Sequence, residues 1–325
     1  MAAASMNVQE QELREKIDPF LTPPNLSEVA SQALGTRVKA SGYRVLTGGC
    51  WNRVIAVPTD TCTLVFKISP RTGDTSLTRE YSVLEVFARD TSLPVATPHL
   101  VDLDGSVIPG SVIVESLIPG EVMHHVFDGL DQGSQERISG EIADYLIELH
   151  THKAQGFGGV ECDESDRYEV WADFWIPRFV QVVDEVEAGD FVSEKMLEEI
   201  KAATEGFPEK LAIGETGTLT HYDIWAGNVM IDGDANPPKV TGFIDIPGYY
   251  ADYAREISFM HVFGMADDRF FRRYARSHPL DPGFILRLNI YSLRTHLKHI
   301  TMYPRESYYR QGALDCLRYI QEHGA

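Results

Sequence analysis

The chain has 325 residues, of which 43% are hydrophobic, and this length fits one large folded domain or two modest ones with a shared cleft. With 29 Lys and Arg against 48 Asp and Glu, the formal net charge is -19, which would repel a phosphate backbone and argues against nucleic acid as a partner. Such a surface would attract a cationic small molecule, although acidic residues that only keep a protein soluble are the more common explanation.

The four cysteines are widely separated and form no C-x-x-C pair, so they suggest neither a zinc site nor a disulfide framework. The first 16 residues lack the basic leader and apolar core of a signal peptide. No segment approaches the roughly 18 uninterrupted apolar residues of a membrane span. We therefore expect a cytoplasmic protein without a membrane partner.

The N-terminal third combines short helices with β-prone runs. After a turn at TPPN, the segment NLSEVASQALG predicts a short helix with Asn25 as its cap and Gly35 as its stop. From residue 37 onward, the pattern predicts a mostly antiparallel sheet with one inserted helix. The expected strands cover residues 43–46, 53–57, 63–68 and 111–117, and the helix covers about 75–89.

Helical periodicity dominates the rest of the chain, through about 134–150, 169–187, 193–204, 254–275 and 283–322. Two β-prone runs interrupt it, VMI (229–231) and KVTGFI (239–244), and the turn-forming DGDANPP between them predicts an antiparallel hairpin. The IPGE turn at 118–121 is the natural boundary. The predicted organisation is a helical extension (1–36), a small lobe that binds nucleotide (37–117), and a larger helical lobe (118–325).

The hairpin carries oxygen-bearing side chains at its outer ends. Asn228 precedes the first strand and Asp245 follows the second, so strand pairing brings their backbones within about 5.5 Å. Two hard-oxygen side chains held at one strand end suit Mg²⁺. Asp223 lies five residues before Asn228, on the loop that leads into the hairpin.

The spacing H-x-D-x-x-x-x-N, followed by an Asp at a strand end, is typical of phosphoryl transfer. Asp223 would accept the proton of the attacking hydroxyl, while Asn228 and Asp245 would hold the metal. Turn and capping roles explain any one of these residues but hardly the spaced set. His221 fits a buried brace for the loop better than a base or a ligand.

A cation for the phosphates is expected in the small lobe. In the strand TLVFKI, alternation places Lys67 on the face opposite Phe66, where a lysine by itself is usually only solvated. In the next helix, Glu80 falls inside the apolar stripe, and a carboxylate there needs a partner. We therefore expect an ion pair between Lys67 and Glu80 that fixes the ammonium.

Two further features would complete a nucleotide site. Gly48 and Gly49 lie between two expected strands and could bring backbone N–H groups close to phosphate oxygens, although adjacent glycines are often only a turn. The backbone from Glu115 to Leu117 runs into the linker and could meet an adenine edge.

With these residues in place, the chain resembles the aminoglycoside phosphotransferase and choline kinase-like superfamily, most of all its fructosamine kinase branch. The resemblance spans about residues 40–265, and its motifs are GGCWN, VFK, VESLIPGE, IELH, HYDIWAGN, FID and YYADYAREIS. It implies an α+β, bilobal, protein-kinase-like fold with ATP in the cleft.

The resemblance also implies roles for single residues. Asp223 matches the catalytic base, Asn228 and Asp245 the magnesium ligands, and Lys67 and Glu80 the phosphate-binding lysine and its partner. On the substrate side, the implied residues are Trp225, Asp252 and Glu256. Tyr222 stands where the family usually has Gly, which leaves the acceptor open.

We therefore expect an ATP- and Mg²⁺-dependent kinase that phosphorylates a hydroxyl of a small polar molecule, such as an amino sugar, a ketosamine, an aminoglycoside-like or another amine-bearing compound. The alternative is a catalytically silent kinase-like module that binds nucleotide or a partner; the intact motif residues argue against it. Metal-dependent hydrolysis would need more carboxylate and histidine ligands than these motifs supply. The preference for ATP over GTP and the oligomeric state stay open.

Overall fold

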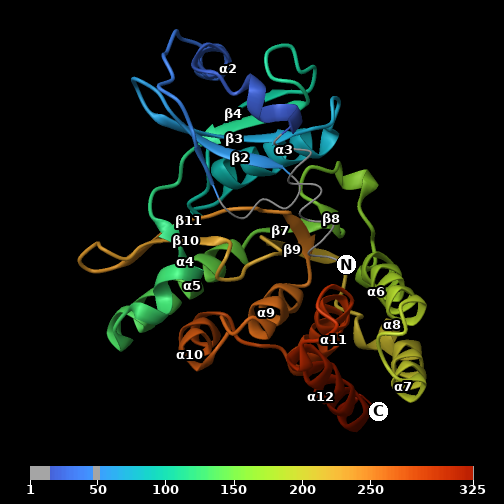
Figure 1. Ribbon diagram of the computed structural model, residues 1–325. Helices are drawn as coiled ribbons and strands as arrows, with labels where there is room; N and C mark the ends of the chain where they lie inside the picture. Colours follow the sequence, from blue (N-terminus) through green and yellow to red (C-terminus); the bar gives the residue numbers. More distant parts are fainter. Residues whose placement is uncertain (1–14, 47–51, 325) are drawn as a thin grey trace. The chain divides into compact units, whose positions relative to one another are not determined.

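The computed structural model describes residues 15–46 and 52–324, and the chain divides into two compact units, Met1–Pro119 and Gly120–Ala325 (Figure 1). Each unit has its own sheets and helices and is described separately below. The predicted phosphate-binding glycines, Gly48 and Gly49, lie outside the described residues.

The N-terminal unit is built on a five-stranded antiparallel sheet with the strand order β1-β2-β3-β5-β4. Its strands are β1 Arg44–Val45, β2 Arg53–Pro58, β3 Thr63–Ser69, β4 Pro98–Asp102 and β5 Ser111–Ser116. Its helices are η1 Asp18–Phe20, α2 Pro23–Leu34 and α3 Thr75–Asp90. The predicted antiparallel sheet with one inserted helix is confirmed. Strand β4 was not predicted, because it begins with a proline at the sheet edge and lacks a clear alternation.

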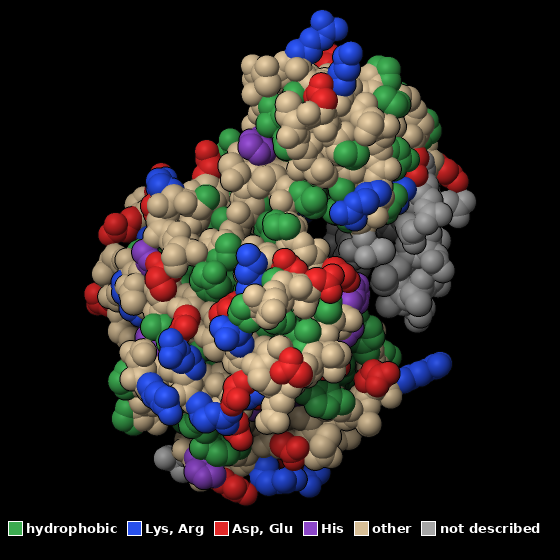
Figure 2. Space-filling model, turned by 90° about the vertical axis from the view of Figure 1, so that its left-hand side faces the viewer, with side chains coloured by type: hydrophobic (Ala, Val, Ile, Leu, Met, Phe, Trp, Pro, Cys, Tyr) green, Lys and Arg blue, Asp and Glu red, His purple; other side chains and the backbone are tan. Residues whose placement is uncertain are grey.

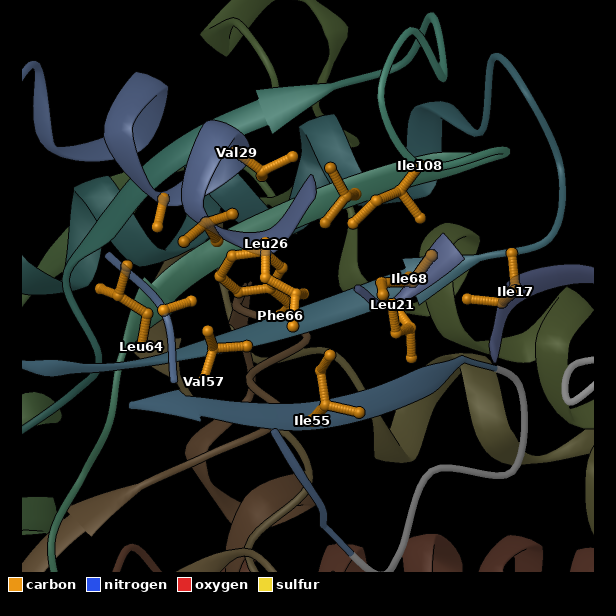
Figure 3. Close-up of a cluster of buried hydrophobic side chains, with 14 of the residues drawn as sticks. Ile17, Leu21, Leu26, Val29, Ile55, Val57, Leu64, Phe66, Ile68 and Ile108 are labelled. Carbon is orange, nitrogen blue, oxygen red and sulfur yellow. The ribbon is translucent and has the colours of Figure 1, made fainter. Parts of the chain in front are cut away.

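One face of this sheet is covered by the segment that precedes it in the chain. Leu64, Phe66 and Ile68 of β3 all point to this face, where they form one buried cluster with Leu26 and Val29 of α2 (Figure 3). Alternation along β3 therefore sends the apolar residues to α2 and Lys67 to the opposite face. Helix α2 is part of the core of this unit.

Helix α2 begins earlier than the sequence pattern predicts. Thr22 is its N-cap, with the Asn25 N–H donating to the Thr22 hydroxyl at 3.5 Å, so the prediction of Asn25 as the cap is wrong. Proline is well tolerated in the first helical turn, where an N–H has no partner within the helix, so TPPN starts the helix instead of preceding it. Gly35 ends the helix with φ 63°, as predicted.

The C-terminal unit is mainly helical. Its helices are α4 Met123–Val126, η2 Phe127–Gly129, α5 Gln132–Leu149, η3 Glu164–Asp166, α6 Trp171–Ala188, α7 Glu194–Glu205, α8 Phe207–Lys210, α9 Tyr253–Val262, α10 Asp268–Ser277, α11 Phe284–Met302 and α12 Ser307–His323. The single helix expected over 254–275 is wrong: the chain turns at Gly264, with φ 74°, and Asp267 caps a new helix.

Two small sheets in this unit frame the predicted catalytic loop. Their strand orders are β11-β10-β6 and β7-β9-β12-β8. The strands are β6 Glu121–Val122, β7 Lys153–Gln155, β8 Gly158–Gly159, β9 Thr216–Thr220, β10 Val229–Asp232, β11 Lys239–Phe243 and β12 Tyr249–Ala251. The predicted hairpin is confirmed, with Val229 of β10 opposite Phe243 of β11. The loop 221–228 and the segment 244–248 therefore leave the hairpin at the same end.

The surface carries both signs of charge. Figure 2 shows acidic and basic side chains interspersed on the face that it displays. Within residues 15–46 and 52–324, no helix combines the length and the hydrophobicity that a bilayer crossing requires.

Candidate active site

Lys67 contacts two carboxylates within the N-terminal unit. Its ammonium forms the predicted ion pair with Glu80 of α3, and it also lies 3.5 Å from Oε1 of Glu115 on β5. The side chain is held in place by these contacts, since only 8% of the residue is exposed. Because Val65 is opposite Glu115 and Lys67 opposite Ile113, Lys67 and Glu115 share one face of the sheet. The sequence predicts a role only for the backbone of Glu115, although alternation along the two strands could have shown this side-chain contact.

Asn228 joins the catalytic loop to the hairpin in the C-terminal unit. Its Nδ2 donates to both the main-chain oxygen and Oδ2 of Asp223, each at 2.9 Å. Its own carbonyl accepts a hydrogen bond from the Ile244 N–H at 3.0 Å, one residue before Asp245. Asp223 and Asn228 are therefore in contact, and Asp245 directly follows a residue that is hydrogen-bonded to Asn228.

The Asp223 carboxyl is largely withdrawn from water. Burial raises the pKa of Asp223 to about 7, and the negative charges of Asp245 and Glu256 act in the same direction. The positive charge of Arg255 and the hydrogen bond from Asn228 lower the pKa and oppose this effect. Asp223 is therefore surrounded by charged groups of both signs, all from the C-terminal unit.

His221 braces the loop, as predicted. It is completely buried, and burial lowers the pKa of its imidazole, which favours the neutral ring. Its Nδ1 accepts a hydrogen bond from the Asp223 N–H at 3.3 Å, and its Nε2 lies 3.2 Å from the Ile244 oxygen. A neutral ring that donates through Nε2 satisfies both contacts and links the loop to the segment before Asp245.

Tyr222 has a left-handed backbone, with φ 80°. Its N–H donates to Oε1 of Glu256 at 2.7 Å. Its ring lies 4.5 Å from the ring of Tyr249, and the Cζ of Arg255 lies 4.1 Å from its centre. A non-glycine residue in this region is costly and persists only where its surroundings hold it. These contacts hold the residue that immediately precedes Asp223.

Glu256 connects the loop to two helices. It is fully buried, and its Oε2 lies 2.8 Å from Nε2 of His150, while Nδ1 of His150 lies 2.6 Å from the hydroxyl of Tyr274. With its other oxygen bound to the Tyr222 N–H, Glu256 positions the catalytic loop. A direct contact between Glu256 and the acceptor stays a prediction.

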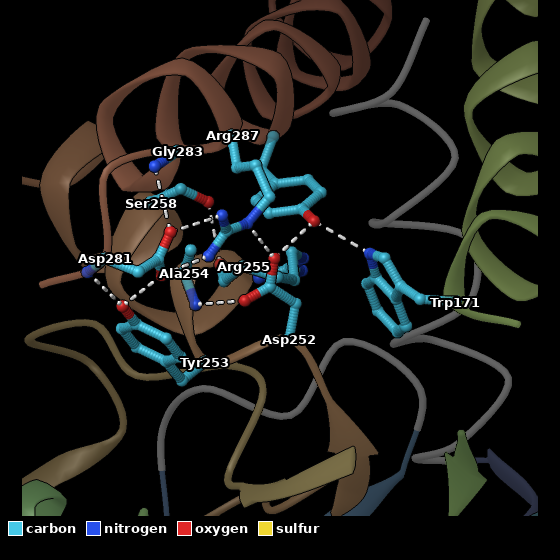
Figure 4. A network of polar contacts seen from close by, with 10 residues as sticks. Trp171, Asp252, Tyr253, Ala254, Arg255, Ser258, Asp281, Gly283 and Arg287 are labelled. Atoms are coloured by element: carbon cyan, nitrogen blue, oxygen red, sulfur yellow. Dashed lines mark hydrogen bonds and ion pairs between the residues drawn. The ribbon is translucent and has the colours of Figure 1, made fainter. Parts of the chain in front are cut away.

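Asp252 is the centre of a second buried network (Figure 4). Its Oδ1 accepts from the Ala254 N–H at 3.0 Å and caps α9, and its Oδ2 accepts from Nε of Arg287 and the hydroxyl of Tyr291, each at 2.6 Å. Trp171 donates to the same hydroxyl at 2.7 Å. With 2% of the residue exposed, Asp252 has a structural role, and its contact with an acceptor stays a prediction.

Trp225 is only partly buried, with its ring 6.3 Å from His124 and 6.1 Å from Phe263. The next residue, Ala226, lines a cavity of about 250 Å³ together with Phe263 and Asp267, all within the C-terminal unit. An aromatic ring at this position suits a sugar or an amine, and the predicted role of Trp225 in binding the acceptor stays a prediction.

The donor set at Asn228 and Asp245 fits a magnesium ion that binds with a nucleotide. In the described part of the chain, no three His, Cys, Asp or Glu side chains form a metal-binding cluster. The side chain of Asn228 donates both of its hydrogen bonds through Nδ2, which leaves Oδ1 as its atom for a cation. Mg²⁺ commonly takes one or two protein oxygens and completes its octahedron with water and phosphate oxygens.

Comparison with known proteins identifies the family of the chain. Residues 23–321 match the model of the fructosamine kinase family. "Protein-ribulosamine 3-kinase, chloroplastic" of Oryza sativa subsp. indica is 23% identical over 295 residues, which cover 87% of this chain and 80% of that protein.

Solved structures show the same fold. A protein of Haemophilus somnus 129PT with the provisional name fructosamine-3-kinase has a TM-score of 0.71 at 16% identity, over 95% of this chain and 99% of its own. The streptomycin-ATP-APH(2")-IIa ternary complex has a TM-score of 0.57 at 16% identity, over 90% of this chain and 94% of its own.

These neighbours confirm the predicted kinase-like α+β fold. The relatives place the protein among the small-molecule kinases. The chain belongs to the fructosamine kinase family, as the motifs indicate.

Two substitutions of Tyr222 separate two contributions to the free energy of unfolding: the cost of its left-handed backbone and the contacts of its ring. Tyr222→Gly and Tyr222→Ala both remove the ring, but only glycine relieves the left-handed conformation. We expect the glycine variant to be more stable by about 1 kcal/mol in urea unfolding. At Tyr319, inside α12, the same two substitutions should rank in the opposite order. If the alanine variant at 222 were as stable as the glycine variant, the backbone at this position would not be strained.

Asp252→Ala should reduce the free energy of unfolding by about 3 kcal/mol or more, because it removes a helix cap and a buried partner of Arg287. Asp184→Ala, at an exposed position of α6, is the control and should change the stability by about 0.5 kcal/mol at most. Equal stability of the two variants in chemical denaturation would show that Asp252 is dispensable to the fold and would favour the acceptor role.

Proposed function

We propose that this kinase transfers the terminal phosphoryl group of ATP to a hydroxyl of a ketosamine, a sugar joined to an amine, in a Mg²⁺-dependent reaction. The observation that carries this proposal is the buried contact between Asp223 and Asn228, beside the segment that leads to Asp245. This arrangement provides one carboxylate for the nucleophile and two oxygen ligands for a metal.

Asp223 would orient the acceptor hydroxyl and accept its proton. The hydrogen bond from Asn228 fixes the carboxylate, and the His221 brace fixes the backbone that carries it. A positioned base of this kind typically contributes about 10²–10⁴-fold to the rate. A bound Mg²⁺, held by Asn228 and Asp245, would screen the charge of the phosphate oxygens.

Lys67 would bind phosphate oxygens of the nucleotide. Its ammonium is restrained by Glu80 and Glu115, so little side-chain entropy would be lost when a phosphate binds. The backbone from Glu115 to Leu117 would contact the adenine edge. The ATP in the APH(2")-IIa complex, a protein with this fold, supports ATP as the donor.

The printed name of the rice relative supports a ketosamine as the acceptor class. Trp225, which is partly exposed beside the catalytic loop, would pack against the sugar or the amine. Glu256 and Asp252 would act through the loop and α9, because their oxygens are engaged inside the protein.

Asp223→Ala tests the proposal most simply. We expect kcat for a ketosamine to fall by about 10²–10⁴-fold, with nucleotide affinity close to that of the wild type, because Asp223 acts on the acceptor. Asp245→Ala should also weaken binding of the metal-nucleotide complex. ATP consumption and nucleotide titration measure both effects, with Asp184→Ala as the control.

Turnover like that of the wild type in Asp223→Ala would refute the assigned base. A wild-type protein that consumes no ATP with any ketosamine, aminoglycoside or choline-like alcohol would favour the catalytically silent module instead.

A further inference from the structure

Three arginines of the C-terminal unit, Arg178 of α6, Arg255 of α9 and Arg294 of α11, form no ion pair with any carboxylate in the described part of the chain. This is unexpected in a protein with a formal charge of -19. Several other described arginines pair with acidic side chains, as Arg273 does with Asp144, whereas Arg178 donates to the main-chain oxygen of Phe174. Within the described residues, no carboxylate therefore neutralises the charge of these three side chains directly.

Two of the three arginines flank a continuous row of aromatic rings beside the catalytic loop. The Cζ of Arg255 lies 4.1 Å from the centre of the Tyr222 ring, which lies 4.5 Å from Tyr249. Tyr249 is 5.8 Å from Phe174, and the Cζ of Arg178 lies 3.8 Å above the Phe174 ring. A guanidinium stacked on a ring can still donate from its edge, and since only Nη1 of Arg178 has a hydrogen-bond partner among the residues that the structure describes, its Nε and Nη2 can bind an oxyanion. The row begins at Tyr222, the residue before Asp223.

Arg294 belongs to the same group. Its Nε donates to the main-chain oxygen of Arg178 at 3.2 Å. Burial lowers the pKa of Arg294, and the positive charges of Arg255 and Arg178 lower it further, against the opposing effects of Tyr222 and Glu185. The positive charge of Arg294 is therefore opposed by those of both other arginines, and a bound anion would relieve this repulsion.

Arg255 has an unsatisfied donor inside the protein. Only 5% of the residue is exposed, and its buried Nη1 has no hydrogen-bond partner among the described residues. A buried charged donor without an acceptor is costly, and such groups in native structures often await a ligand. The guanidinium of Arg255 lies over the ring of Tyr222, the residue before Asp223. The unsatisfied group is thus close to the proposed base.

We propose that Arg178, Arg255 and Arg294 bind a carboxylate of the acceptor while its hydroxyl lies at Asp223. This inference rests on the proposed function and narrows its acceptor class. A ketosamine of a free amino acid carries an α-carboxylate a few bonds from its sugar hydroxyls, whereas an amino sugar has no anionic group. The acceptor is therefore a zwitterion and not the purely cationic molecule that the net charge suggests.

Two acceptors that differ in one group test the proposal, fructosyl-glycine and fructosyl-glycinamide. Both have the same sugar and a secondary amine, but only the first has a carboxylate. We expect the wild type to use fructosyl-glycine with a kcat/KM about 10- to 100-fold higher, the range expected for hydrogen bonds between arginine and a carboxylate. The difference should lie mainly in KM.

Arg178→Gln should reduce this preference at least tenfold by raising KM for fructosyl-glycine, and it should leave KM for fructosyl-glycinamide nearly unchanged. Comparing the two acceptors within each variant cancels the effect of their different amine pKa values. Arg178 is only partly buried, so its replacement is tolerated better than that of Arg255, and Arg276→Gln on the exposed face of α10 is the control. The comparison in the wild type needs no variant and stands if Arg178→Gln unfolds.

Equal use of both acceptors by the wild type would overturn the carboxylate site and leave the kinase proposal intact, because ATP would still be consumed. If Arg178→Gln reduced kcat/KM equally for both acceptors, this result would also overturn the carboxylate site. A residue that only packs against Phe174 would affect both acceptors equally. No turnover of either acceptor by the wild type would overturn the ketosamine proposal and this inference together.

Discussion

The catalytic end of the C-terminal unit depends on one buried amide, the side chain of Asn228. It holds the Asp223 carboxylate through Nδ2, and its main chain pairs with Ile244, so the loop, both strands of the hairpin and the approach to Asp245 are fixed together. His221 adds a second link between the same two segments. Without these links, a loop that leads into a hairpin would be a flexible position for the proposed base and metal ligand. Rigidity matters here because phosphoryl transfer relies mainly on positioning and charge.

Two networks of buried charged side chains stabilise the position of this loop. Glu256 joins the loop to α5 and α10 through His150 and Tyr274, and Asp252 joins the start of α9 to α11 through Arg287. Buried polar networks of this kind add little net stability, but they are costly to break and so favour one arrangement. Glu256 also accepts the Tyr222 N–H and so helps to hold this residue in a backbone conformation that a tyrosine adopts rarely, with its ring beside Tyr249 and Arg255. Arg255 and Arg178 lie at the two ends of the same row of rings, so the proposed carboxylate site is next to the loop.

The parts of the site that could be predicted from the sequence depend on short-range patterns. The hairpin follows from two β-prone runs and a turn, and the contact between Lys67 and Glu80 follows from alternation in a strand and periodicity in the next helix. Partners far apart in the chain left no such signal: His150 and Tyr274 are separated by 124 residues, and Arg178 and Arg294 by 116. The structural roles of Asp252 and Glu256 were hidden for the same reason. The cap of α2 was misplaced because two prolines, which usually mark a turn, here begin a helix.

The central proposal is that Asp223, Asn228 and Asp245 of the C-terminal unit form one site for a metal-nucleotide complex. A crystal structure with Mn²⁺ in place of Mg²⁺ and a non-hydrolysable ATP analogue tests it most directly, because Mn²⁺ is located by its anomalous signal. We expect the ion about 2.0–2.2 Å from Oδ1 of Asn228 and from a carboxylate oxygen of Asp245. An ion bound away from both residues would contradict it.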